Sequence, residues 1–316
     1  MIKKKNPALP HDFTQASEDF NKAKNKALIS KLSNIMNSKR DDLLSFYDVK
    51  EILKPANQVY LGMKSIPINM IIGSEGRYRD FNKHFHPRKE FMRSRWENID
   101  RAHIKDIPLP AIQLYEIGGA YFVRDGNHRV SVARLQGAEE IDAEVISLSS
   151  EINIVSSMTT DDLKKAVIDL EKKTFYKKTD FLELTGDNDL NFTSTGSYDR
   201  IYMHILDHKY FSNLDKPEEI PFSDALVSWY REIYMPIIKI INKERLDSVF
   251  QGKNPCDLYI WIVRQWDFQK RNKGCSYSVT AAAKNFAKRY GSQQRHTTRI
   301  IRILLGNIFR IKASVL

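Results

Sequence analysis

The feature that most constrains the fold of this chain is a stretch in which a strand, a turn and a helix follow one another without a linker. A strand is expected at Ala120–Val123, because aromatic and β-branched residues follow the turn pair Gly118-Gly119. The turn is Asp125-Gly126-Asn127-His128-Arg129. A helix is expected over 130–136, since residues 130, 132, 133 and 135 are apolar and Gly137 is a suitable C-cap. Strand and helix must therefore meet at this turn.

The composition of the turn favours the binding of an anion. Gly126 permits a close backbone approach, and Asn127 is a good N-cap residue. The first helical amides then point at whatever lies above the turn, and a helix N-terminus carries roughly half a positive charge. Arg129 and His128 stand beside it. Phosphate is the expected ligand. The alternative is an ordinary strand–turn–helix junction with Arg129 in a salt bridge.

The segment from about Leu61 to Ile146 resembles the ParB/sulfiredoxin superfamily, whose members bind or process nucleotides. In partition-type members a strand leads into a Gly-Glu-Arg-Arg box, which is followed by a helix ending in glycine and by a further strand. The matching positions here are Gly126, Asn127, His128 and Arg129 for the box, Gly137 for the closing glycine and Ile141–Val145 for the strand.

The box also departs from the partition branch. Its His-Arg pair is more similar to the sulfiredoxin and free-serine-kinase branches, and Asn127 stands where partition proteins have glutamate. Sulfiredoxin needs a cysteine ahead of the His-Arg pair, whereas Cys256 and Cys275 lie far outside the box. The resemblance therefore implies nucleotide binding and does not imply sulfiredoxin activity.

A second candidate phosphate contact follows the first strand of the same segment. Residues 73–79, Gly-Ser-Glu-Gly-Arg-Tyr-Arg, place two arginines beside two glycines. A guanidinium fork matches phosphate oxygens, and the resemblance puts the first arginine box of partition proteins here. We expect Ser74, Arg77 and Arg79 to close over the phosphate, with an arginine-rich solvated loop as the alternative.

Together these patterns predict an α+β fold, a ParB/sulfiredoxin-like small mixed sheet. The expected divisions are an N-terminal helical segment at 1–56, a nucleotide- or phosphate-binding domain at 57–150 and an all-helical domain at 151–316. Within the first division we expect two helices, and within the second a strand over Ser65–Ser74. A helix over Phe222–Asn242 should be kinked or broken at Pro236. An apolar stripe on the first helix comprises Leu28, Ile29, Leu32, Ile35 and Met36.

The net charge of +11 is confined to the C-terminal end of the chain. Asp267 is the last acidic residue, and 11 of the 50 Lys and Arg residues follow it, which leaves 39 basic and 39 acidic residues before. A region of one sign, here 268–316, indicates an acidic partner. Removing it should abolish DNA retention.

The same region has the pattern of a helix-turn-helix unit. A helix at Val279–Tyr290, a turn at Gly291-Ser292 and a helix from Gln293 follow one another, with the small residue Ala287 four before the glycine. We expect DNA, before RNA, as the partner. The alternatives are a basic surface packed on the same chain and an amphipathic membrane contact through 300–309. The residues expected to contact nucleic acid are Lys284, Lys288, Arg289, Gln293, Gln294, Arg295, Arg299 and Arg302.

The sequence gives little support to other classes of protein. It shows no secretory pattern and no apolar run near the roughly 20 residues of a membrane span, so a cytoplasmic location is expected. The pairs His84/His86 and His204/His208 lack further ligands at an obvious spacing, and no metal site is expected.

The resulting hypothesis is a nucleotide-binding, nucleic-acid-associated regulator of the partition or transcription type. Its nucleotide would be CTP or ATP/ADP, with Mg²⁺ as a further candidate, and a homodimer is considered. The alternative is a small-molecule kinase or NTP-hydrolysing enzyme, with Asp125 or His128 assisting proton transfer.

Overall fold

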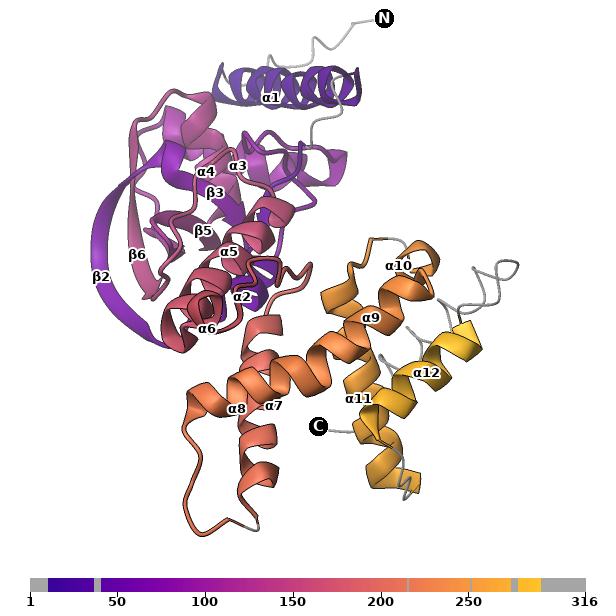
Figure 1. Cartoon of the computed structure of the whole chain (residues 1–316). Helices are drawn as coiled ribbons and strands as arrows, with labels where there is room; N and C mark the ends of the chain where they lie inside the picture. The colour runs from indigo at the N-terminus through magenta and orange to yellow at the C-terminus, as the bar shows by residue number, and fades with distance from the viewer. Residues whose placement is uncertain (1–10, 37–40, 215, 251, 274–277, 291–316) are drawn as a thin grey trace, which may run out of the picture. The chain divides into compact units, whose positions relative to one another are not determined.

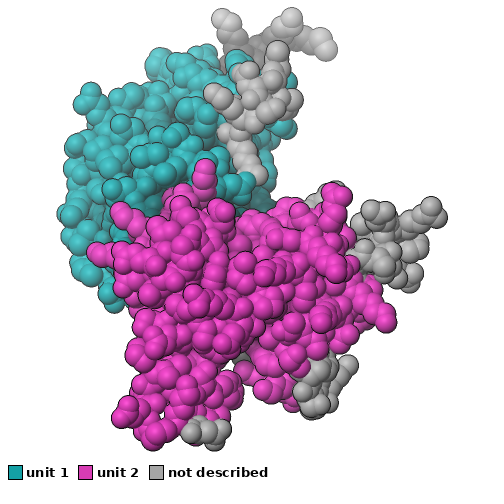
Figure 2. Space-filling model, viewed as in Figure 1, with its two compact units in different colours: residues 1–164 teal, residues 165–316 magenta. Residues whose placement is uncertain are grey.

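The computed structural model describes residues 11–36, 41–214, 216–250, 252–273 and 278–290. The chain divides into two compact units, 1–164 and 165–316, coloured separately in Figure 2. Each unit has a hydrophobic core of its own. The first unit combines a sheet with helices and the second is helical, so the predicted α+β class is confirmed. The helical residues expected to precede the sheet as a segment apart, 1–56, lie in the same unit as the sheet.

A six-stranded mixed sheet organises the first unit, in the order β1-β3-β5-β4-β6-β2. Strands β2, β3, β5 and β6 of this sheet are labelled in Figure 1. Strands β1, β3 and β5 are parallel to one another. Strand β4 runs antiparallel to β5 and parallel to β6, and β2 forms the outer edge, antiparallel to β6. The strand bounds are β1 Leu44–Ser45, β2 Gln58–Pro67, β3 Ile71–Ser74, β4 Ile112–Ile117, β5 Ala120–Asp125 and β6 Glu140–Leu148.

The helices of the first unit follow the expected order. Strand β5 ends at Asp125 and α4 begins at Asn127, so the turn between them is where the sequence predicts it. The bounds are α1 His11–Met36, α2 Phe46–Leu53, α3 Arg93–Ile104 and α4 Asn127–Leu135, with 3₁₀ turns at Ile68–Met70 and Glu90–Met92. Helix α5, Thr160–Thr179, begins in the first unit and ends in the second.

The two faces of the sheet carry different helices, because successive side chains of a strand point to opposite faces. Val123 of β5 belongs to the same core cluster as Trp96 of α3, so α3 lies on this face, together with α4. Phe122, the preceding residue, contacts Phe46 of α2 with ring centroids 5.8 Å apart. Tyr115 of β4 stacks on the same Phe46 ring at 4.2 Å. Helix α2 therefore covers the face opposite to α3 and α4.

The strand expected over Ser65–Ser74 is wrong in one respect, because the chain turns a corner in its middle. Strand β2 ends at Pro67 and β3 begins at Ile71. Arg134 of α4 fixes this corner by donating to the carbonyl oxygens of Ile68 and Ile71 at 2.7 and 2.6 Å. The corner allows β2 to pair with β6 and β3 with β5.

Helix α1 buries a different set of residues from the apolar stripe that the sequence suggested. Leu28, Ile29 and Leu32 are all exposed, and the side chains of residues 35 and 36 lie outside the described part. The buried face is formed by Ala16, Phe20, Ala23 and Ala27. Their spacing of three and four residues keeps them on one side of the helix, and small alanines allow a close approach to α3.

Helices joined by loops, without a strand, make up the described residues of the second unit. The interruption expected near Pro236 takes the form of a π-helical turn at Tyr230–Tyr234, after which Pro236 lies in the first turn of the next helix. Proline has no N–H to donate to the preceding turn, and the π-helical turn directly before it accommodates the missing hydrogen bond. The remaining bounds are α6 Phe181–Thr185, α7 Ser197–Asn213, α8 Phe222–Trp229, α9 Met235–Lys243, α10 Leu246–Val249, α11 Pro255–Lys273 and α12 Val279–Tyr290. Among the described helices, none combines the length and the apolar character that crossing a membrane requires.

Candidate functional site

The two segments that the sequence singled out meet at one edge of the sheet. Because β3 and β5 are parallel neighbours, their carboxyl ends lie side by side, with Ser74 paired to Val123. The amide of Glu75 then donates to the carbonyl oxygen of Val123 at 2.9 Å. The loop after β3 and the turn after β5 therefore start from the same place. Ligands of sheets with parallel strands bind outside the carboxyl ends of those strands.

The turn after β5 depends on Gly126. Its φ of 106° lies in the left-handed region, and a Cβ there would stand 2.4 Å from Cγ2 of Ile112. Gly126 itself, rather than Asn127 as expected, occupies the N-cap position, and no side chain caps the helix there. The first hydrogen bond within α4 runs from the amide of Val130 to the carbonyl of Gly126 at 3.0 Å. The amides of residues 127–129 thus have no acceptor within the helix.

Two polar side chains at this N-terminus are buried without a hydrogen-bond partner. Asn127 is 8 % exposed and His128 is 5 % exposed. Within the described part of the chain, neither Oδ1 of Asn127 nor Nδ1 of His128 has a partner. A buried polar atom without a partner costs about 1–3 kcal/mol and is rare in native proteins. Oδ1 of Asn127 and Nδ1 of His128 therefore keep unused hydrogen-bonding capacity at the N-terminus of α4.

The surroundings of His128 are apolar on one side and positively charged on the other. Its ring meets the Phe81 ring edge-on, with centroids 5.5 Å apart. Burial, together with the smaller effects of the Arg77 and Arg95 charges, lowers the pKa of His128 to about 4, and the charge of Asp80 opposes this shift. The imidazole is therefore neutral at pH 7 and lies within the field of two cations.

Arg129 is engaged in holding the turn. Its guanidinium donates to the carbonyl oxygens of Pro110 and Ala111, the latter at 2.8 Å, and to Oδ2 of Asp125 at 2.6 Å. These bonds tie the turn to the segment that leads into β4. The salt bridge that formed part of the alternative interpretation is thus present. The charge of Arg129 remains beside the turn, although its donors are engaged by protein oxygens.

The three residues expected from the loop after β3 differ in what they contribute. Ser74 is fully buried, and its hydroxyl donates to Val123 O and accepts from the Arg77 amide, both at 3.3 Å. Arg77 pairs with Asp80 at 3.2 Å. Arg79 is exposed and stacks over the adjacent Tyr78 ring at 5.4 Å. Ser74 shapes the loop, Arg77 contributes charge to the site, and Arg79 faces solvent.

Arg95 on α3 adds positive charge that acts on His128, and it was not among the site residues predicted from the sequence. Indole Nε1 of Trp96 donates to Oγ of Ser131 on α4 at 2.8 Å, and both residues are buried. This contact between α3 and α4 brings Arg95 close enough to act on His128. No local sequence pattern signals it, because the proximity arises only from the packing of α3 against α4.

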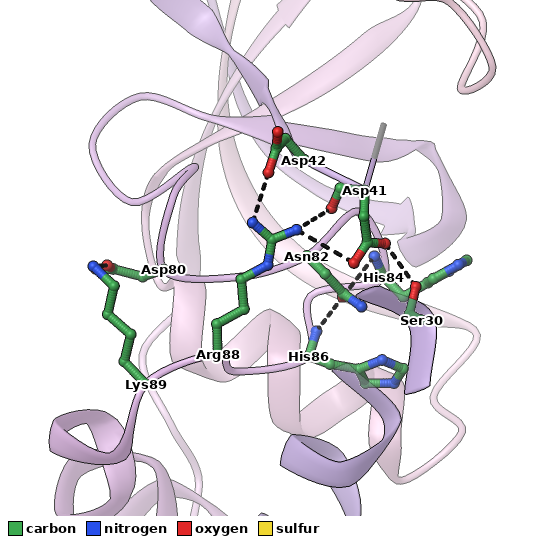
Figure 3. Close-up of polar contacts among 9 residues, drawn as sticks. All are labelled: Ser30, Asp41, Asp42, Asp80, Asn82, His84, His86, Arg88 and Lys89. Atoms are coloured by element: carbon green, nitrogen blue, oxygen red, sulfur yellow. Dashed lines mark hydrogen bonds and ion pairs between the residues drawn. The ribbon is translucent and has the colours of Figure 1, made fainter. Parts of the chain in front are cut away.

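Ion pairs fix the loop between β3 and α3 to the residues that precede β1. Arg88 donates through Nη1 to Oδ1 of Asp42 at 2.6 Å and through Nη2 to Oδ2 of Asp41 at 3.3 Å (Figure 3). In the same view Lys89 contacts Asp80 at 2.9 Å. Since Asp41 and Asp42 lead directly into β1, these bonds also fix the start of α2 relative to the site.

The His84/His86 pair belongs to the same loop. Oδ1 of Asn82 accepts from the backbone amides of both histidines, at 3.0 and 2.9 Å (Figure 3). The two rings are 5.9 Å apart. Burial lowers the pKa of His84, and it lowers the pKa of His86 to about 4. Among the described residues, no group of three or more His, Cys, Asp or Glu side chains is placed to hold a metal ion.

Comparison with protein-family models, curated proteins and solved structures finds no significant match to this chain. The ParB/sulfiredoxin resemblance accordingly stays a prediction. The chemistry of the site rests on its own geometry: unsatisfied helix amides, a neutral buried imidazole, a buried amide and nearby guanidinium groups.

The candidate nucleic-acid residues are only partly described. Lys284, Lys288 and Arg289 are exposed on α12, whose bounds coincide with the predicted helix. The opposite side of α12 contributes Ala283 and Phe286 to the core of the second unit. Outside the described residues lie the predicted turn, the second helix and Gln293, Gln294, Arg295, Arg299 and Arg302.

Proposed function

We propose that this chain is a nucleotide-binding regulatory protein associated with nucleic acid, and that the N-terminus of α4 holds the phosphates. The observation that carries the proposal is the pair of buried, unpartnered polar atoms on Asn127 and His128, located where a helix starts at the carboxyl ends of parallel strands. A helix N-terminus supplies amide donors and a favourable dipole for an anion. Arg77 and Arg95 add positive charge.

The roles of the side chains follow from their hydrogen-bonding capacity. The neutral imidazole of His128 donates from Nδ1 to a phosphate oxygen in the tautomer that protonates this nitrogen. Oδ1 of Asn127 accepts from a hydroxyl or amino group of the same ligand. A nucleotide carries both kinds of group, whereas inorganic phosphate at neutral pH offers mainly acceptors. Ser74 and Arg129 position the loop and the turn.

A nucleotide screen tests this proposal. CTP, ATP, ADP and GTP, each with and without Mg²⁺, are titrated into the full chain by calorimetry and by thermal shift. We expect at least one to bind, and Arg95→Gln and His128→Ala each to weaken it about tenfold, the loss of one charged or buried hydrogen bond. Lys64→Gln removes an exposed charge on β2, across the sheet, and serves as the matched control. The proposal is refuted if none of the four nucleotides binds. It is also refuted if both site variants bind nucleotide as tightly as the native protein.

The association with nucleic acid is supported by the segregated charge and by the exposed cations of α12. Because α12 also packs into the core of the second unit, a deletion of 268–316 would remove core residues together with charge. The sharper variants are a deletion of 291–316 and a triple change of Lys284, Lys288 and Arg289 to Gln. Log affinity for DNA should fall with log salt by about 0.9 per phosphate neutralised. Both variants should lower that slope while the nucleotide-induced thermal shift remains. Absence of DNA and RNA binding at low salt would refute this half of the proposal.

The enzyme alternative is favoured by one observation, the exposed carboxylate of Asp125 beside the turn, 59 % exposed and paired with Arg129. Such a group could accept the proton of an attacking hydroxyl. Turnover of ATP or ADP with a small hydroxyl substrate, lost in Asp125→Asn with nucleotide affinity unchanged, would establish a phosphotransferase in place of a binding protein.

A further inference from the structure

The chain leaves the parallel part of the sheet towards opposite faces. Helix α2 follows β1 and packs against Phe122 and Tyr115, whereas β3 and β5 lead to α3 and α4 on the other face. In sheets of this kind a crevice opens at the carboxyl edge between the two strands where the direction changes. Here that position lies between β1 and β3. It adjoins the ends of β3 and β5, where the proposed phosphate site lies.

Tyr47 spans this position. It lies in the first turn of α2, 58 % of its surface is exposed, and its hydroxyl donates to Oε1 of Glu75 at 3.0 Å. Glu75 is the first residue after β3 and is bonded through its amide to Val123 of β5. The hydrogen bond from Tyr47 and the charge of Glu75 raise the pKa of the phenol. The side chain of Tyr47 thus connects α2 to the strand ends beside the site.

The backbone that carries Tyr47 is fixed, although its ring is exposed. The adjacent Phe46 stacks on Tyr115, with the two ring planes 7° apart. Ser45 caps α2 by accepting from the amide of Asp48 at 3.3 Å. Only the exposed bond to Glu75 is recorded for the phenol hydroxyl in the described structure. The ring can therefore rotate away from Glu75 at the cost of one exposed hydrogen bond and of its tilted contact with the Phe46 ring at 5.9 Å, while its attachment point stays in place.

We propose that Tyr47 is the stacking wall for the base of a nucleoside di- or triphosphate whose phosphates bind at α4. This inference rests on the proposed function and extends it to residues before the segment with the ParB-like pattern. In the free protein the Tyr47–Glu75 bond joins α2 to the loop after β3. When the nucleotide enters, the base stacks on the phenol ring, and the released Glu75 carboxylate accepts from a hydroxyl or amino group of the nucleoside. Aromatic rings suit this role because every base presents a π-face.

The test compares ligands with and without a base. Calorimetry on the full chain measures the affinity of ATP, CTP and inorganic tripolyphosphate for the native protein, Tyr47→Ala and Tyr47→Phe. Stacking on an aromatic side chain is worth about 1–3 kcal/mol per base. Tyr47→Ala should therefore weaken the nucleotide that binds by about tenfold or more and leave tripolyphosphate within about twofold. Tyr47→Phe keeps the ring and removes the bond to Glu75, so its nucleotide affinity should equal or exceed that of the native protein.

A matched control is Tyr60→Ala, which removes an equally exposed tyrosine from β2 at the far edge of the sheet. It should bind all ligands normally. Equal weakening of nucleotide and tripolyphosphate by Tyr47→Ala, or loss of nucleotide binding in Tyr47→Phe, would overturn the stacking role. If Tyr47→Ala does not fold, Tyr47→Phe and Tyr47→Leu are compared instead. Tyr47→Leu should then weaken nucleotide binding about tenfold or more and leave tripolyphosphate binding within about twofold. If the native protein binds none of these three ligands and neither ADP nor GTP, the proposed function itself is refuted.

Discussion

Gly126 is the residue on which the geometry of the turn depends most directly. Gly126→Ala would place a methyl group 2.4 Å from Ile112 Cγ2 at a φ of 106°. Gly137→Ala is the control, since Gly137 also has a positive φ of 79° but nothing within 4 Å of a Cβ. Both changes cost about 1–2 kcal/mol for the left-handed backbone, and the clash should add about 1–3 kcal/mol at Gly126. Urea unfolding measures the difference in the free energy of unfolding between the two variants. Equal losses of stability in both would show that the turn relaxes to relieve the clash with Ile112.

His128 should make the stability of the first unit depend on pH. Burial lowers its pKa to about 4, whereas an unfolded histidine titrates near 6.5. Between these values the unfolded chain binds more protons, so the stability contributed by neutral His128 is complete above pH 6.5 and is lost as the pH falls towards 4. The full loss amounts to about 3 kcal/mol, at about 1.4 kcal/mol per unit.

Urea unfolding between pH 7.5 and 4.5 checks this dependence in the native protein and in His128→Gln. The variant should show a smaller slope. Part of the slope should remain because burial also lowers the pKa of His86 to about 4. Identical slopes would mean that His128 is solvated in the folded protein.

The turn could be predicted from the sequence because its determinants act within a few residues. Gly126 permits the left-handed backbone, and Gly137 follows the end of α4. Arg95 and Tyr47 could not be found in this way. The electrostatic effect of Arg95 on His128 and the hydrogen bond of Tyr47 to Glu75 depend on how α3 and α2 pack in the folded chain.

At the scale of single elements, α1 shows how an apolar pattern can be assigned to the wrong face. The large apolar residues Leu28, Ile29 and Leu32 were predicted to form the buried face. The face that is buried instead consists of one phenylalanine and several alanines. Periodicity gives the direction of an apolar face, but it does not say which face finds a partner. Here the partner is α3, whose Trp96 meets the Phe20 ring edge-on at 5.6 Å.

A pair of substitutions tests this orientation of α1. Phe20→Ala should cost about 3–5 kcal/mol, because it removes a fully buried ring from the contact with Trp96. Leu32→Ala should change stability by no more than about 0.5 kcal/mol, as expected of an exposed side chain. Denaturant unfolding measures both. A reversed order would place the other face of α1 against the protein.

The bond between α3 and α4 provides a second test at this scale. Ser131→Ala removes the acceptor of the fully buried Trp96 indole N–H, and an unsatisfied buried donor costs about 1–3 kcal/mol. Ser94→Ala, an exposed change on α3, is the control. If the two variants unfold alike, the bond does not stabilise the packing that brings Arg95 to the site.

At the scale of the whole molecule, the α+β class could be predicted, whereas strand β1 and the order of the sheet could not. The glycine turns and apolar runs that mark strands are local signals. Arg88 helps to hold β1 beside β3 by binding Asp41 and Asp42, although it lies 46 or 47 residues from them in the sequence. No pattern within either segment indicates that they meet.

Ligand binding should be visible as local protection within the molecule. A ligand that binds only the folded state stabilises it by about 2.7 kcal/mol at 100 times its Kd. In hydrogen exchange, nucleotide should therefore slow the amides at the ends of β3 and β5 and in the first turns of α2 and α4. The amides of α7 and α11 serve as the internal reference. Protection confined to the second unit would place the ligand away from the proposed site.

The pairing of β2 with β6 has a consequence for how the chain is made. This ladder joins Gln58 to Leu148 and Pro67 to Glu140, so it closes a loop of up to 90 residues. Closing such a loop costs conformational entropy before the contacts between the two strands can stabilise it, and this order of events slows folding. The second unit is built largely from contacts between helices near one another in sequence, such as α7 with α8 and α11 with α12. During synthesis the sheet cannot be completed until Leu148 has left the ribosome. On refolding from denaturant, the half that is translated last should be the first to fold.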